Sequence, residues 1–71
     1  MNLLAAEIGK EYTVKDVVTE DEEFNSFLFS LGCYSGEPII VISHRRSGCV
    51  VSIKGARYNM DNELAKAVVL F

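Results

Sequence analysis

The sequence predicts a small, mainly β protein with short helices, folded as a partly open β-barrel. The 71 residues allow one domain, 1–71, with a thin hydrophobic core. Several short apolar segments, some of them alternating, are separated by turn residues, a pattern typical of an all-β fold. Barrel closure also protects strand edges, which a small open sheet would expose to other chains.

The first predicted elements are a strand and a helix. Residues 11–17 alternate as a strand does, after an apolar lead-in that contains Leu3, Leu4 and Ile8. Thr19 and Glu22 have the spacing of a helix capping box, and Gly32 is placed to end the helix in a left-handed cap. Apolar residues at i, i+3, i+4 and i+7 should pack one helix stripe on the barrel: Phe24, Phe27, Leu28 and Leu31.

A β-hairpin is predicted next, from strands at residues 37–43 and 49–54 with turn residues between them. Two registers are possible. A loop of four residues, 45–48, pairs His44 with Cys49, whereas a loop of five pairs Ser43 with Cys49. The residues turned inward would be Ile40 and Ile42 in the first register, and Ile39 and Val41 in the second.

The last predicted elements are a short helical turn and a strand. Gly55 ends the second hairpin strand, and Asp61 can cap a helical turn that runs through Lys66. Met60 and Leu64 should face inward beside it. Residues 67–71 form an apolar final strand, so the predicted order is strand, helix, hairpin, helical turn, strand.

Charge and composition exclude several functions. Seven basic and ten acidic residues give a net charge of −3, whereas a nucleic-acid binder normally presents a basic face. No apolar run approaches the length needed to insert into or cross a bilayer, and the N-terminus does not have the pattern of a secretory signal. With one histidine and no nucleophile motif, the sequence predicts neither an enzyme nor a bound cofactor.

Cys33, His44 and Cys49 are the candidate metal ligands. Two thiolates and an imidazole suit zinc, ferrous iron or another transition metal, and His44 and Cys49 flank one hairpin loop. Structural zinc sites, however, use four ligands at tight spacing, and no such spacing is present. We therefore predict no metal site, and interpret the cysteines as packed thiols in a reducing cytosol.

The order of motifs resembles the FeoA family of ferrous iron transport proteins. The resemblance lies in the lead-in to Gly9, in residues 31–36 before the hairpin, and in an aliphatic pattern at the end: Met60, Ala65, Val68 and Leu70. Ile8 replaces the usual proline, and residues 43–48 form a shorter hairpin tip than is usual. The resemblance implies an SH3-like barrel and a cytoplasmic accessory protein that binds and modulates FeoB, a membrane transporter with a cytosolic GTPase domain.

Two alternatives to this function remain open. One is a stand-alone SH3-like regulatory module of an iron-dependent transcriptional repressor system, which would act through a partner because no DNA-binding half is present. The other is direct carriage of ferrous iron by the three candidate ligands. If the protein binds FeoB, this partner would recruit it to the inner face of the membrane.

Residues 39–42 are all apolar, so both faces of this strand are hydrophobic. The resemblance favours the five-residue loop, which turns Ile40 and Ile42 outward. An apolar spot with a basic rim is typical of a protein contact. We therefore predict that it binds the cytosolic part of the transporter or a second copy of the chain, through Ile40, Ile42, His44, Arg45 and Val50.

Overall fold

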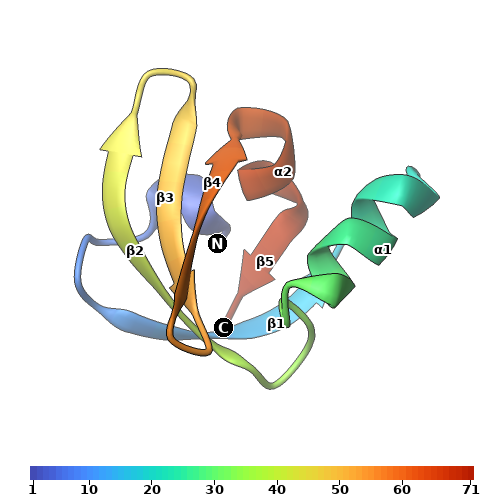
Figure 1. Ribbon diagram of the computed structural model, residues 1–71, viewed down its shortest axis with the longest axis horizontal. Coiled ribbons are helices and arrows are strands. Elements are labelled where there is room, and N and C mark those ends of the chain that lie inside the picture. The colour runs from blue at the N-terminus through green and yellow to red at the C-terminus, as the bar shows by residue number, and fades with distance from the viewer.

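The computed structural model describes residues 1–71 as a curled antiparallel sheet of five strands with two short helices (Figure 1). The strand order is β4-β3-β2-β1-β5, so β4 and β5 are the edges and the barrel is not closed. The predicted mainly β, partly open barrel is therefore confirmed. The elements are a 3-10 turn η1 (Leu3–Ala5), β1 (Glu11–Val17), α1 (Glu22–Ser30), β2 (Pro38–Arg45), β3 (Gly48–Ile53), β4 (Ala56–Asp61), α2 (Asn62–Ala67) and β5 (Val68–Leu70).

Strand β4 is the element that the sequence prediction missed. Ile53 pairs with Ala56, so β3 and β4 form a second hairpin with only Lys54 and Gly55 in its turn. These turn residues have φ angles of 50° and 81°. A two-residue hairpin turn of this kind usually has Asn-Gly or Asp-Gly, and lysine at the first position carries no such signal. Gly55 does end the second hairpin strand, as predicted, but the predicted order of elements was wrong in having no strand between Gly55 and the helical turn.

The β2–β3 hairpin combines parts of both predicted registers. His44 pairs with Cys49, as in the first register, and pairing continues to Arg45 opposite Gly48. The buried residues are nevertheless those of the second register, Ile39 and Val41. A β-bulge reconciles the two, because Ile42 is an extra residue between the Val41–Val51 and Ser43–Val50 pairs.

Helix α1 is capped at both ends, although one cap differs from the prediction. Asp21, rather than Thr19, is the N-cap, and its carboxylate accepts from the Glu23 and Phe24 N–H groups. Thr19 instead accepts from the Asp21 N–H. The predicted cap at Gly32 is confirmed: its φ is 91°, and the Gly32 and Cys33 N–H groups donate to the Phe29 and Leu28 carbonyls in a Schellman arrangement.

Only part of the predicted stripe of α1 packs on the barrel. Leu28 is fully buried, and Phe24 and Leu31 pack partly against the core. Phe27 is 47% exposed and Phe29 is 65% exposed, so the expectation that Phe27 is docked was wrong. The helix lies at the side of the barrel and is held mainly near its C-terminal end, which leaves part of its apolar surface uncovered (Figure 1).

The hydrophobic core combines inward residues of all five strands with η1, α1 and α2. Val14, Val41 and Val51 have no exposed surface. Helix α2 begins as predicted, because the Asp61 carboxylate accepts from the Leu64 N–H at 2.8 Å. Met60 and Leu64 are buried, and the predicted final strand is present as β5.

Leu28→Ala should lower the free energy of unfolding by about 2 to 4 kcal/mol, because it leaves a cavity where α1 meets the core. Phe29→Ala is the matched control: it removes a larger side chain from the same helix, but one that is mostly exposed. It should cost clearly less than Leu28→Ala. Urea unfolding measures both, and equal losses would contradict this account of how α1 is docked.

Candidate protein-interaction surface

The outward side of β2 and β3 carries an apolar strip. Ile40, Ile42 and Val50 are half-buried there, and we call the surface around them the outer sheet face. Ile40 pairs with Ser52, whereas Ile42 and Ser43 together oppose Val50 at the bulge. Helix α2 packs mainly on β3, β4 and η1, and neither helix makes an extensive contact with β2. The three aliphatic side chains therefore lie on a part of the sheet that no helix covers.

The bulge separates the two basic residues predicted at the rim of this strip. Arg45 pairs with Gly48, is exposed, and belongs to the outer sheet face. His44 pairs with Cys49, whose side chain is buried, so the histidine ring lies on the opposite side of β2. Its Nε2 is 2.7 Å from the Ala6 carbonyl oxygen, to which an Nε2–H group donates. His44 thus ties the N-terminal segment to the hairpin.

The three candidate metal ligands occupy different environments. Cys33 follows α1 and Cys49 lies on β3, and both are buried free thiols in the core. His44 is exposed and hydrogen-bonded to Ala6. No three histidine, cysteine, aspartate or glutamate side chains are grouped so that they could hold a metal ion. The structure therefore offers no donor set that a transition metal would need.

We expect protein purified without chelator to contain no stoichiometric metal, because a closed zinc site needs four ligands that converge on one point. Elemental analysis tests this expectation. About one zinc or iron per chain, lost in Cys33→Ser but kept in a serine variant at an exposed position such as Asn25→Ser, would contradict it.

Burial makes both thiols poor nucleophiles. It raises the pKa of the Cys33 thiol from an ordinary 9.0 to about 11, and it raises the pKa of the Cys49 thiol as well. Thiolate is the reactive form, so neither group is activated near neutral pH.

Alkylation at pH 8 should therefore be slow in the folded protein and fast after unfolding. The pKa of Cys33 is higher in the folded state, so the folded protein holds this proton more tightly than the unfolded chain does. The free energy of unfolding should then fall as the pH rises from 9 towards 11, and Cys33→Ala should reduce this fall. Rapid labelling of both thiols in folded protein would contradict their burial.

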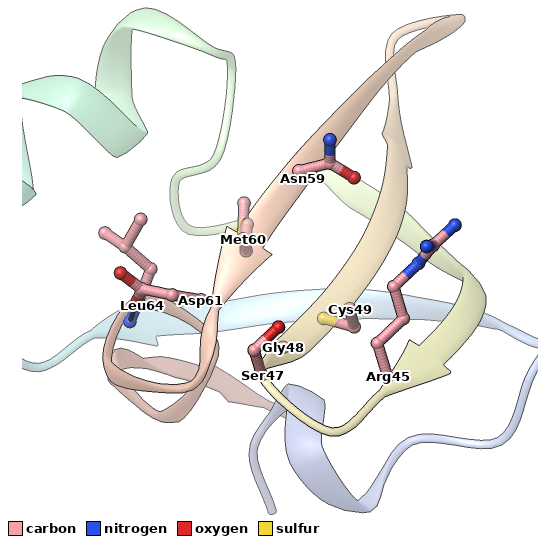
Figure 2. Close-up of a pocket in the computed structure, with 8 residues that line it drawn as sticks. All are labelled: Arg45, Ser47, Gly48, Cys49, Asn59, Met60, Asp61 and Leu64. Carbon is pink, nitrogen blue, oxygen red and sulfur yellow. Dashed lines mark hydrogen bonds between the residues drawn. The ribbon is translucent and has the colours of Figure 1, made fainter.

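A pocket of about 510 Å³ lies where the end of the β2–β3 hairpin meets the start of α2 (Figure 2). Its polar groups hold elements together. The Asp61 carboxylate caps α2, and the Asn62 side chain beside it donates to the Arg46 carbonyl. Since Cys49, the thiol in its wall, has a raised pKa, we assign no catalytic role to this pocket.

A second cavity, of about 480 Å³, was not predicted. It lies between the C-terminal end of α1 and the β3–β4 turn and is lined by aromatic and aliphatic side chains: Phe29, Leu31, Tyr34, Ile53 and Tyr58. Lys54 also lines this cavity. Its Nζ atom is 3.0 Å from the Glu37 carboxylate and 5.5 Å from the centre of the Tyr34 ring. The sequence contained one sign of this apolar surface, because Phe29 lies off the predicted helix stripe.

These features define a small SH3-like domain with partly exposed apolar surfaces. The chain belongs to the FeoA family, because the model of the FeoA domain matches residues 1–70. This family is associated with ferrous iron transport. No curated protein sequence matched the chain significantly. No helix is both long enough and apolar enough to cross a membrane.

Solved structures of several proteins have the same fold. An iron uptake regulatory protein, FeoA, is 22% identical with a TM-score of 0.88, and the match covers 99% of this chain and 93% of that one. FeoA from Stenotrophomonas maltophilia, solved with zinc and described as a prokaryotic SH3 domain protein, is 20% identical with a TM-score of 0.87, covering 100% and 89%. A manganese-dependent transcriptional repressor bound to manganese is 22% identical with a TM-score of 0.91, covering 100% of this chain but 35% of the repressor.

Proposed function

We propose that this protein is a cytoplasmic accessory protein of ferrous iron uptake that binds the cytosolic part of an FeoB-type transporter and modulates it. The FeoA domain match over residues 1–70 is the observation that carries this proposal. A protein with buried thiols and no cluster of metal ligands is better suited to act on a transporter than to carry iron itself.

The outer sheet face is the proposed contact surface. Its strip of Ile40, Ile42 and Val50 lies on paired strands that are already ordered, so binding loses little conformational entropy. Arg45 at its border adds a charged group that can select a partially acidic partner surface. Helix α1 exposes more apolar area at Phe27 and Phe29, but it is held to the barrel mainly near one end and has an acidic first turn.

Ile40→Glu with Ile42→Lys should weaken binding to the purified cytosolic part of the transporter by about tenfold or more, equivalent to at least about 1.4 kcal/mol. The charges that the two substitutions introduce cancel each other. Two of the three aliphatic side chains of the strip are replaced. Titration calorimetry measures the affinity, and circular dichroism verifies that the variant is folded.

Phe27→Ser with Phe29→Ser is the matched control, because it removes apolar surface from α1 and leaves β2 intact. It should bind as the unmodified protein does. A folded Ile40/Ile42 variant with full affinity would contradict the proposed surface, and a loss confined to the Phe27/Phe29 variant would assign the contact to α1.

The repressor-like alternative is favoured by one observation, the fold shared with part of a manganese-dependent repressor. A module of that kind would bind a repressor chain rather than a transporter. Affinity purification from native membranes and cytosol separates the two functions. Recovery of a repressor without the transporter would favour the alternative.

A further inference from the structure

Strand β4 has one edge that no other part of the chain pairs with. It is hydrogen-bonded to β3 alone, and neither of the isolated β-bridges involves it. In Figure 1, β4 lies between β3 and β5, but it is hydrogen-bonded only to β3. Unpaired N–H and C=O groups along such an edge are a template for another strand.

The pairing with β3 determines which backbone groups are free. Ile53 and Ala56 flank the two-residue turn, and the Asn62 N–H donates to the Ser47 carbonyl at 3.1 Å. Hydrogen-bonded pairs alternate along an antiparallel ladder, so the groups of every second residue point towards β3. The residues between them direct their N–H groups to the open edge: Arg57, Asn59 and Asp61. All three are exposed.

The opposite edge of the sheet cannot accept this strand. The Leu70 N–H of β5 donates to the Met1 carbonyl at 2.7 Å, and Asn2 forms a bridge with Val69. The N-terminal segment therefore occupies the edge that a β4 strand of a neighbouring copy would need for head-to-tail pairing. This leaves an edge-to-edge contact between two β4 strands.

We propose that two copies of this chain associate through their β4 edges, as antiparallel strands related by a two-fold axis at Asn59. In this register Asn59 lies opposite its own copy, and Arg57 of each chain lies opposite Asp61 of the other. Opposite charges that face each other across a strand pair are stabilising. A shift of two residues in either direction places Asn59 opposite a charged residue and leaves other charges unpaired.

Asp61 can cap α2 and face Arg57 of the other chain at the same time. One carboxylate oxygen accepts from the Leu64 N–H, as the N-cap of α2, and the other oxygen has no partner within the chain. Strand β4 contains neither proline nor a bulge, two of the features that block pairing at an exposed edge. Since Arg57, Asn59 and Asp61 project on the same side of the sheet as Val50 and Ser52, the dimer would join two outer sheet faces into one surface.

Sedimentation velocity over a series of concentrations tests the association. We expect the mass to rise from one chain towards two in the micromolar range, since a short edge contact of this type is small. Amide hydrogen exchange then locates the contact. At high concentration the Asn59 and Asp61 N–H groups should exchange more slowly, whereas the Tyr58 N–H, already bonded within the sheet, should not change.

Two variants test the register. Asn59→Pro removes the N–H group at the axis without removing a bond of the barrel, and should abolish association. Arg57→Asp places like charges opposite each other and should weaken association by about tenfold, and adding Asp61→Asn, which keeps a good N-cap, should partly restore it. Lys10→Asp, the same change of charge on the loop before β1, is the control and should associate normally.

A chain that stays monomeric at millimolar concentration would overturn the proposal. So would a dimer in which slowed exchange maps to α1, or one that Asn59→Pro leaves intact. These outcomes are independent of the proposed transporter contact, because the variants leave Ile40 and Ile42 unchanged. The amide measurement uses the unmodified protein, so it decides the question even if a variant fails to fold.

Discussion

The β-bulge at Ile42 is the constraint on which the rest of the sheet depends. A strand has a period of two, so β2 can both bury Ile39 and Val41 and pair His44 with Cys49 only if its pairing with β3 is displaced by one residue before the hairpin end. The extra residue gives this displacement. It also places two consecutive side chains on the outer face and turns His44 back to the Ala6 carbonyl, which fixes the N-terminal segment beside the hairpin.

Much of this fold could be predicted because its signals are local. Alternation located β1, and the capping chemistry of Asp61 located α2. The elements that could not be predicted depend on longer-range geometry. In the β3–β4 turn Lys54 lies in the left-handed region, which lysine seldom adopts. Its side chain forms an ion pair with Glu37, a residue distant in the sequence. A bulge likewise leaves no pattern in the sequence, so the register stayed undecided.

The candidate surface was predictable in composition but not in geometry. Four successive apolar residues on β2 predict that two of them face outward, but they do not show whether another element covers this pair. In the structure the outward pair, Ile40 and Ile42, is half-buried. Periodicity also gave the stripe of α1, but a stripe does not tell how closely a helix approaches its sheet. Leu28 and the Schellman cap anchor the helix near its C-terminal end, so Phe27 and Phe29 remain at the surface.

The two edges of the open barrel are treated differently, and this difference connects the fold to association. At β5 the chain uses its own N-terminus, with Met1 and Asn2 bonded along the strand, and so satisfies the edge within one molecule. The same N-terminal segment is held in place by His44, and therefore by the bulge. At β4 the chain turns directly from Asp61 into α2, and none of residues 1–71 pairs with the outer edge of the strand. The barrel therefore satisfies one edge internally and leaves backbone groups unpaired at the other, which is the kind of edge that a strand of a second molecule can extend.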